Sequence, residues 1–142
     1  MRFCQLVLLS ALALGCCLAE APKSAPQSTK LRGKLTQRDG QPPAIQTDDH
    51  RLITVEGDEA AIKVLKDKRL NGTELEAAGH FTAPDHFKLD PNHARSVMVR
   101  KNGKLKMITY WCDVCSIRSY EPGPCWCCQA ETVLDLRDPD EP

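Results

Sequence analysis

The chemistry of this sequence is concentrated in five cysteines near its C-terminus. They follow the pattern C-x2-C-x9-C-x-C-C, which contains two C-x2-C pairs, Cys112 with Cys115 and Cys125 with Cys128. In such a pair both sulfurs can converge on one ion, while the backbone amides between them soften the thiolate charge. Four thiolates suit tetrahedral Zn²⁺, with bonds of about 2.3 Å. The spacing predicts a structural, zinc-like metal site held by these four cysteines.

The fifth cysteine, Cys127, lies outside the predicted ligand set. In an extended turn a C-x-C pair such as Cys125 and Cys127 points its side chains to opposite faces. We therefore expect Cys127 to face away from the ion, beside Trp126 or solvent. A bulged turn would allow the alternative, in which Cys127 replaces Cys128 as a ligand.

The segment between the two pairs favours a hairpin. Residues 122–124, Pro-Gly-Pro, form a turn that can fold the second pair back on the first, and flanking strands would frame a zinc-ribbon-like hairpin. Two features depart from the usual pattern of such sites. The nine-residue gap is shorter than the common spacing of about 15–20 residues. Ser116 and Gln129 also stand where zinc knuckles usually place glycine.

This C-terminal block resembles the end of a family of uncharacterised exported bacterial proteins. Members share a tryptophan followed by C-x2-C, an intervening isoleucine and aromatic residue, a Pro-Gly-Pro turn and a C-x-C-C motif. The resemblance implies export and assigns no activity. The matching residues are Trp111, Cys112, Cys115, Ile117, Tyr120, Pro122, Gly123, Pro124, Cys125, Cys127 and Cys128.

Three other interpretations of the cysteine cluster stay open. Disulfides are expected in small exported chains with a thin core, and five cysteines permit two bridges and one free thiol. Cu(I) would find soft ligands in the C-x-C-C thiolates and in Met98 or Met107. The Trp111-Cys112-x-x-Cys115 segment is similar to the redox motif of thioredoxins, although Pro122 follows too soon for the activating helix that this motif requires.

The N-terminus has the features of a secretory signal peptide over residues 1–19. A basic Arg2 precedes the apolar core of residues 6–14, and small residues end the segment before Glu20. The predicted localisation is export, either periplasmic or secreted. A lipoprotein anchored at Cys16 is the less favoured alternative, because the residues before it match a lipoprotein signal poorly. The apolar run is shorter than the roughly 20 residues of a membrane span, so no transmembrane segment is expected in the mature chain.

Composition limits the classes of function. The chain has 142 residues with 19 basic and 19 acidic side chains, so it is sized for one domain and has no net charge that favours nucleic acid. Leu, Ile, Val and Phe are sparse after residue 19. Their content is close to the level at which a small chain needs disulfides or a bound metal to stabilise its fold. No nucleophile motif, phosphate loop or paired carboxylates with a base appear, so we predict no enzyme.

The elements that must position the cysteines are mainly strands. Asn102-Gly103 between two alternating runs predicts a hairpin, because both turn residues must reach positive φ. Leu75, Ala77 and Phe81 are expected on one side of a strand. The segment 59–70 is expected to form a short helix without a sharp cap, or else to be extended. The predicted strands cover residues 31–36, 52–57, 73–81, 96–101, 104–111 and 132–137.

This pattern predicts a mainly β fold, a small OB-like barrel or sandwich with a C-terminal cysteine-rich, zinc-ribbon-like hairpin. The segment 70–79, with its leucine-asparagine-glycine start, resembles the middle strand of exported bacterial OB-like domains. The predicted organisation is a signal peptide over 1–19, a flexible leader over 20–30, an OB-like β-domain over 31–111, a cysteine-rich metal-binding-like hairpin over 112–137 and an acidic, frayed tail over 138–142.

The remaining polar residues carry weaker signals. We expect His80, His86 and His93 to be ordinary surface histidines, since their spacing does not favour a metal site. A basic hairpin formed by Arg95, Arg100, Lys101, Lys104 and Lys106 is either a polyanion-binding edge or a solvated tip whose lysines prevent aggregation. The second interpretation is preferred, because aromatic side chains that could stack on bases are missing nearby.

The sequence therefore predicts an exported, non-enzymatic protein with a structural Cys4 zinc-like site and an unidentified partner. The alternatives are a disulfide-stapled module that binds a polyanion or oligosaccharide, and a thiol-redox or copper-handling protein.

Overall fold

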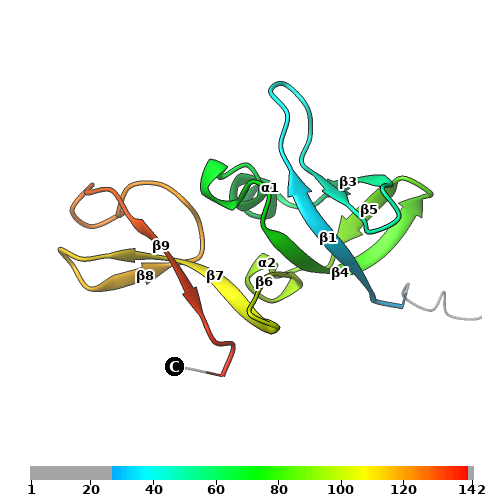
Figure 1. Cartoon of the computed structure of the whole chain (residues 1–142). Coiled ribbons are helices and arrows are strands. Elements are labelled where there is room, and N and C mark those ends of the chain that lie inside the picture. The colour runs from blue at the N-terminus through cyan, green and yellow to red at the C-terminus, as the bar shows by residue number, and fades with distance from the viewer. Residues whose placement is uncertain (1–26, 141–142) are drawn as a thin grey trace, which may run out of the picture.

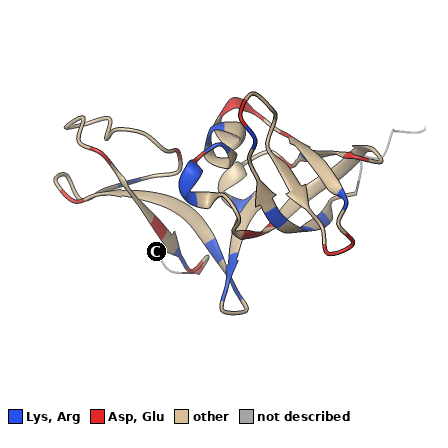
Figure 2. Ribbon diagram, turned by 45° about the horizontal axis from the view of Figure 1, so that its top comes forward, with Lys and Arg blue, Asp and Glu red and all other residues tan. Residues whose placement is uncertain are grey.

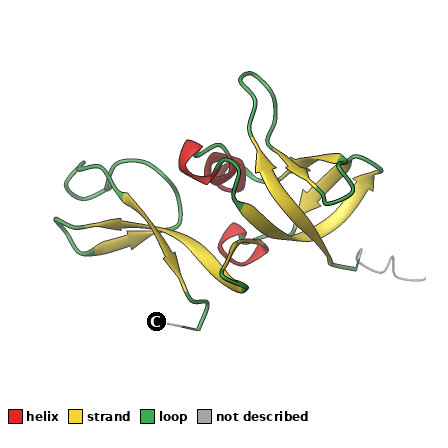
Figure 3. Cartoon of the chain, viewed as in Figure 1, coloured by secondary structure: helices red, strands yellow, loops and turns green. Residues whose placement is uncertain are grey.

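The computed structural model describes residues 27–140. The predicted signal peptide, Cys16 and most of the predicted leader lie outside the described residues. Within them, strands account for 47% and helices for 12%, so the fold is mainly β as predicted. Figure 3 shows the strands in yellow, with short helices at one end of the barrel and beside the C-terminal strands.

Five strands form an OB-like barrel (Figure 1). They are β1 (Thr29–Thr36), β2 (Ala44–Gln46), β3 (Leu52–Glu56), β4 (Glu74–Ala83) and β5 (His86–Leu89). Their order is β1-β2-β3-β5-β4, and β4 pairs back with β1 to close the barrel. The β3–β5 pairing is parallel, and the other four pairings are antiparallel. Because the barrel is closed, few of its strands have an edge with unpaired backbone N–H and C=O groups.

Alternating apolar residues fill the barrel. Leu35 of β1, Ile53 and Val55 of β3, and Leu75 of β4 are all 0–1% exposed. This follows from the two-residue period of strands, which sends every second side chain to the interior. Phe81 lies near the end of β4 and is 44% exposed, so the predicted apolar side of this strand is buried at Leu75 and Ala77 but not at Phe81.

Two glycines allow neighbouring barrel strands to approach closely. A Cβ atom on Gly33 would lie 2.2 Å from the carbonyl oxygen of Gln46, and one on Gly79 would lie 2.1 Å from that of Lys88. Both distances are far below van der Waals contact, so a larger residue at either position would force the strands apart.

One end of the barrel is covered by α1 (Glu59–Leu65) and the short 3₁₀ helix η1 (Lys68–Leu70). The predicted helix over 59–70 is thus divided in two. It also has a cap that the prediction missed, because the Asp58 carboxylate accepts a 2.8 Å hydrogen bond from the backbone N–H of Ala61. The helix presents Ala61, Val64 and Leu65 to the core.

The predicted hairpin around Asn102-Gly103 is confirmed. It joins β6 (Val97–Lys101) to β7 (Lys104–Cys112), and the turn residues have φ values of 52° and 75°. A short helix, α2 (His93–Ser96), leads into β6. Because β6 pairs with β4, this hairpin extends the barrel sheet outward.

The C-terminal strands are built on the far half of β7. There β8 (Ile117–Ser119) pairs with Tyr110–Cys112, and β9 (Val133–Arg137) pairs with Met107–Trp111. Figure 1 shows this group as a second lobe, connected to the barrel by the long β7. The predicted boundary between residues 111 and 112 falls inside β7, so one strand serves both lobes.

Several boundaries differ from the predictions. Strand β1 begins at Thr29, which places Thr29 and Lys30 in the sheet and not in the predicted flexible leader. Neither β2 nor β5 was predicted. In the acidic tail, Asp138 pairs with Lys106 at 2.8 Å, so the described part of this tail is anchored at its first residue. In the described part of the chain, no helix is both long and apolar enough to cross a bilayer.

Candidate metal centre

The two predicted cysteine pairs lie in two tight turns of the C-terminal lobe. Cys112 ends β7 and is paired with Ile117 at the start of β8, so the first pair spans this turn. The second pair is closed by an isolated bridge between Pro124 and Glu131. Inside that bridge, the backbone N–H of Cys125 donates a 2.8 Å hydrogen bond to the carbonyl oxygen of Ala130.

The two turns share one backbone conformation. The residue after each pair, Ser116 and Gln129, has a positive φ of 52° and 61° respectively. These are the positions where zinc knuckles usually carry glycine. Ser116 and Gln129 thus differ from zinc knuckles in residue type only. Their backbone has the left-handed conformation that glycine favours.

The first cysteine of each pair accepts hydrogen bonds from the backbone of its own turn. The Cys112 sulfur accepts from the N–H groups of Cys115 and Val114. The Cys125 sulfur accepts in the same way from the N–H groups of Cys128 and Cys127. These donors disperse thiolate charge, which is the role expected of amides inside a C-x2-C pair.

The four predicted ligand sulfurs come together. Those of Cys112, Cys115, Cys125 and Cys128 all lie within 4.8 Å of one another, and the Cys112–Cys128 separation is 3.5 Å. A tetrahedral zinc site with bonds of about 2.3 Å needs sulfurs about 3.8 Å apart. The cluster therefore has the size that such an ion requires.

No disulfide links the described cysteines, and all five are free thiols. Cys112 and Cys125 are buried, Cys115 is half-buried, and Cys128 is exposed. In each pair the first sulfur thus lies on the inner side of the cluster and the second lies toward solvent.

The thiols influence one another's protonation. Hydrogen bonds from the N–H groups of Cys128 and Cys127 lower the pKa of Cys125 to about 7. The thiols of Cys128 and Cys127 raise the pKa of Cys115. The N–H of Cys115 favours the Cys112 thiolate, but burial and the neighbouring sulfurs outweigh it, so the pKa of Cys112 is raised. Four thiolates would repel each other here, so the fully deprotonated cluster needs a cation.

Cys127 lies outside this group of four, and its side chain is exposed as expected. That it faces away from the ion stays a prediction, but its side chain is not remote from the other sulfurs. Its sulfur interacts with that of Cys115 and raises the pKa of Cys115. Cys127 therefore lies beside the four-sulfur group and not remote from it.

The other candidate ligands are elsewhere. His86 Nδ1 lies 2.7 Å from a carboxylate oxygen of Glu56, and His93 Nε2 lies 2.9 Å from the carbonyl oxygen of Tyr120. Met98 faces Met107 across the β6–β7 ladder. Met107 precedes Cys112 by five strand residues, roughly 17 Å along the chain. Among the described residues, the four cysteines form the one group of three or more potential ligands.

Contacts with the barrel hold the cysteine lobe in place. Arg69 of η1 donates a 3.0 Å hydrogen bond to the carbonyl oxygen of Thr132, and its guanidinium lies 5.1 Å from the centre of the Tyr110 ring. Thr132 in turn donates through its hydroxyl to the carbonyl oxygen of Gly123 at 2.7 Å. Arg69 could not be identified from the sequence, because Thr132 and Tyr110 are more than forty residues away from it in the chain.

Figure 2 shows basic residues, in blue, along the β6–β7 hairpin, and some of them have acidic partners. Arg100 lies 2.7 Å from a carboxylate oxygen of the buried Glu76, and Lys106 is paired with Asp138. Two of its five cations thus have acidic partners that are distant in sequence, which weakens the polyanion-binding interpretation.

No protein-family model, curated protein or solved structure matches this chain. The similarity of its C-terminal block to exported bacterial proteins therefore stays a resemblance of motif, and function is inferred from the site itself.

Proposed function

We propose that this chain is an exported, non-enzymatic protein in which zinc, bound by Cys112, Cys115, Cys125 and Cys128, holds the C-terminal strands beside the OB-like barrel. The observation that carries the proposal is the occurrence of the same turn twice. Each turn has a C-x2-C pair, N–H donors to its first sulfur and a positive φ after its second. Export is supported by the signal-peptide features of residues 1–19.

Zinc is favoured over other metal cations at this site. An all-sulfur donor set excludes Mg²⁺ and Ca²⁺, which prefer oxygen ligands. The thioether ligands suggested for copper, Met98 of β6 and Met107 of β7, face each other on a part of the ladder distant from the cysteine turns. A closed set of four protein ligands also leaves no open position for a substrate, which is typical of structural zinc and not of catalytic zinc.

Thiol-redox activity is less well supported. Cys115 is followed by the strand β8 and not by a helix whose N-terminus would activate Cys112. The pKa of Cys112 is raised by burial and by the neighbouring sulfurs of Cys128 and Cys125, although the Cys115 N–H opposes them. An attacking thiol needs the opposite shift. We expect the purified chain not to reduce insulin; reduction that disappears in Cys112→Ser would favour an oxidoreductase.

The metal content of the mature chain, purified without chelators, tests the proposal. We expect about one zinc per chain. Cys112→Ser, Cys115→Ser, Cys125→Ser and Cys128→Ser should each lose most of it. Cys127→Ser is the matched control, since it removes a thiol of the same cluster that lies outside the four-sulfur group, and it should keep the metal.

Two outcomes would contradict this assignment. If Cys127→Ser loses the metal while Cys128→Ser keeps it, the ligand set is wrong. If the untreated protein holds no metal and is four hydrogens lighter than its reduced form, two disulfides take the place of the zinc site.

Export is tested separately by the intact mass of the protein from the producing cell. Cleavage by signal peptidase predicts a chain that begins at Glu20. A chain that begins at an acylated Cys16 would show a lipoprotein, and an uncleaved chain found in the cytoplasm would contradict export.

A further inference from the structure

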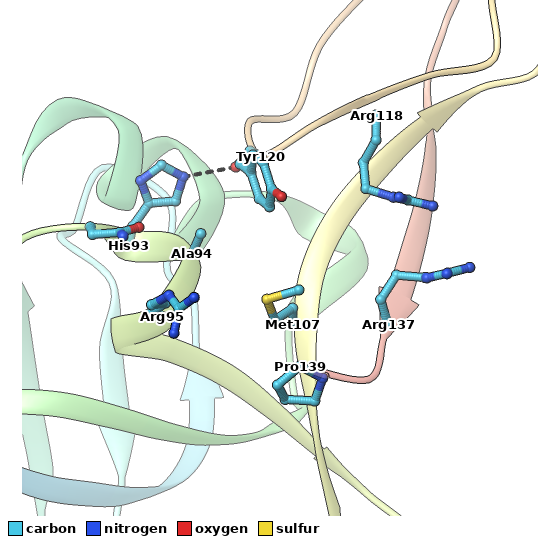
Figure 4. Close-up of a pocket in the computed structure, with 9 residues that line it drawn as sticks. His93, Ala94, Arg95, Met107, Arg118, Tyr120, Arg137 and Pro139 are labelled. Atoms are coloured by element: carbon cyan, nitrogen blue, oxygen red, sulfur yellow. Dashed lines mark hydrogen bonds between the residues drawn. The ribbon is translucent and has the colours of Figure 1, made fainter. Parts of the chain in front are cut away.

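Two cavities of similar volume, about 450 and 440 Å³, open on the described part of the chain. The first lies between α2 and the C-terminal strands, where Figure 4 shows His93 bonded to the carbonyl oxygen of Tyr120. Two of its three arginines, Arg118 and Arg137, already have partners within the protein. The second cavity, on the barrel, is lined by cations that have no such partners.

This second cavity lies between the β1–β2 loop and the end of α1, which Figure 1 shows beside each other. Hydrogen bonds join the two walls, because Gln37 Nε2 donates to the carbonyl oxygens of Leu65 and Asp67 at 2.7 and 2.8 Å. Further along the loop, the carbonyl oxygen of Pro43 accepts a 2.9 Å hydrogen bond from the N–H of Val55. The loop is therefore held in place without a ligand, which reduces the entropy lost on binding.

The lining of this cavity is positively charged. Arg38 of the loop lines it together with Lys66 and Lys68 of the helical side, and all three are exposed. None of the three side chains has a partner among the described residues. Asp39 is the one acidic residue of the lining, so three positive charges less one negative charge leave two. The carboxylate of Asp67, between the two lysines in sequence, is already paired with an arginine at 2.8 Å. Such a balance attracts a ligand with several negative charges.

A smaller apolar hollow of about 280 Å³ adjoins the cavity and shares Lys66 and both prolines of the loop with it. Its accessible apolar surface comes from the exposed Pro42 and the half-buried Ile62 of α1. Glu56 also lines the hollow, and its carboxylate lies 2.7 Å from Nδ1 of His86. A cationic surface thus continues directly into an apolar one.

The combination of the two surfaces favours a peptide over other polyanions. Neither lining contains an aromatic side chain, whereas the bases of single-stranded nucleic acid bind by stacking on aromatic rings. An acidic glycan has no aliphatic side chain that could fill the hollow beside Ile62. A peptide supplies both groups, since carboxylate side chains can alternate with an aliphatic one along a single chain.

We propose that this surface binds an acidic peptide segment of a partner protein. Its carboxylates lie against Arg38, Lys66 and Lys68, and one aliphatic side chain lies on Pro42 and Ile62. Charge complementarity selects the acidic residues, and the adjoining hollow selects the aliphatic one. The surface contains none of the cysteines, so it goes beyond the proposed zinc centre and does not depend on it.

Calorimetric titration of the mature protein with a synthetic peptide tests the proposal. The probe has a central leucine with three glutamates on each side, and we expect saturable binding that weakens as the salt concentration rises. The same peptide with serine in place of leucine should bind at least about fivefold more weakly, because the hollow stays empty. A peptide with lysines in place of the glutamates should not bind.

Removing the three cations tests the protein side. The triple variant Arg38→Gln, Lys66→Gln, Lys68→Gln should weaken binding of the glutamate–leucine peptide at least about tenfold, because each exposed ion pair contributes up to a few-fold in affinity. All three residues are exposed, so the fold should be retained. The matched control changes three exposed lysines outside both linings and should leave the Kd within about twofold. It carries the substitutions Lys88→Gln, Lys101→Gln and Lys104→Gln.

Several results would overturn the proposal. One is the absence of saturable peptide binding below about 1 mM. Another is an equal loss of affinity in the control variant, which would show attraction to charge anywhere on the protein. Equal binding of the leucine and serine peptides would refute the apolar contact. Tighter binding of a heparin oligosaccharide or of oligo(dT) with the same charge, lost in the triple variant, would assign this surface to a glycan or a nucleic acid and not to a peptide.

Discussion

Ser116 and Gln129 hold a backbone conformation that their side chains disfavour. A residue other than glycine loses about 1–2 kcal/mol in the left-handed region, and both residues have φ values there. Each turn nevertheless keeps its geometry, since the residues before it donate N–H groups to a cysteine sulfur. The shape of the cysteine cluster therefore outweighs the local preference of these two residues.

Replacing either residue by glycine should stabilise the protein. We expect Ser116→Gly and Gln129→Gly each to raise the free energy of unfolding by about 0.5–1 kcal/mol, because the relief of strain exceeds the extra entropy of the unfolded chain. Ser119→Gly in β8 is the control and should lower stability, since glycine weakens a strand. Thermal denaturation measures all three; a loss of stability in both knuckle variants would argue against the left-handed turns.

Glu76 makes stability depend on pH. Its carboxylate is 5% exposed and pairs with Lys30, Arg32 and Arg100 at 2.7–2.8 Å. Burial raises the pKa of Glu76, but hydrogen bonds from Lys30 and Arg100 outweigh it and hold the pKa below the ordinary 4.5. A lowered carboxyl pKa means that the stabilisation is present above that ordinary value and is lost as pH falls through the lower one of the folded state.

Glu76→Gln should cost about 2 kcal/mol at pH 7, the scale of hydrogen bonds to a charged group. The difference from the natural chain should shrink as pH falls below 4.5, because Glu76 itself becomes neutral there. Urea denaturation at pH 7 and pH 3 measures this. A difference that stays the same at both pH values would show that Glu76 acts through packing and not through charge.

At this scale the sequence predicted the cysteines well. Their spacing was sufficient to predict the four sulfurs that the structure brings together. It also predicted that Cys127, which is exposed, is not one of the four. The contact between Cys127 and Cys115 was not predictable, because it depends on how the second turn folds over the first.

At the scale of elements, local signals determined which strands could be predicted. The β6–β7 hairpin has an Asn-Gly turn and alternating flanks, so it was predicted closely. By contrast, β2 has three residues and β5 has four, which is too short for a periodic pattern. Both are held by pairing with neighbours, β2 by β1 and β3, and β5 by β3 and β4. Such strands depend on long-range contacts that a local pattern does not contain.

Arg69 connects two elements that are far apart in sequence. Its guanidinium pairs with Asp67 at 2.8 Å, reaches the carbonyl oxygen of Thr132 at 3.0 Å and covers the Tyr110 ring. Burial, with the nearby Asp67 carboxylate, raises the pKa of Tyr110, so this phenol stays neutral at ordinary pH. One side chain thus joins η1 to both β7 and the approach to β9.

Arg69→Lys should separate geometry from charge. Lysine keeps the positive charge but lacks the planar fork, so we expect a loss of about 1–2 kcal/mol in the free energy of unfolding. Arg38→Lys, a matched change at an exposed residue, should have little effect. Chemical denaturation measures both. Equal stability of Arg69→Lys and the natural chain would show that charge alone suffices at this contact.

At the scale of the whole molecule, the two lobes have different means of stabilisation. The barrel is filled by its own strands and α1, with side chains such as Leu35, Ile45, Leu65 and Phe87 almost completely buried. The C-terminal lobe adds Ile108 and Tyr110 to that core from β7, but β9 contributes only partly buried leucines. The cysteine cluster lies at the far end, between β8 and the segment that leads into β9. This arrangement makes β9 the strand most dependent on the cluster.

Metal removal should therefore loosen the C-terminal lobe and leave the barrel folded. We expect a chelator, or Cys112→Ser with Cys115→Ser, to abolish amide-exchange protection in β8 and β9 while β1 to β5 keep theirs. Because folding energy from the site is lost, Tm should fall by at least about 10 °C. Hydrogen exchange read by mass spectrometry distinguishes the lobes, with Cys127→Ser as the control that retains protection. Unchanged exchange in β9 and an unchanged Tm would mean that the cysteine cluster does not stabilise the C-terminal lobe. Loss of protection throughout β1 to β5 would mean that the barrel cannot fold without the cluster.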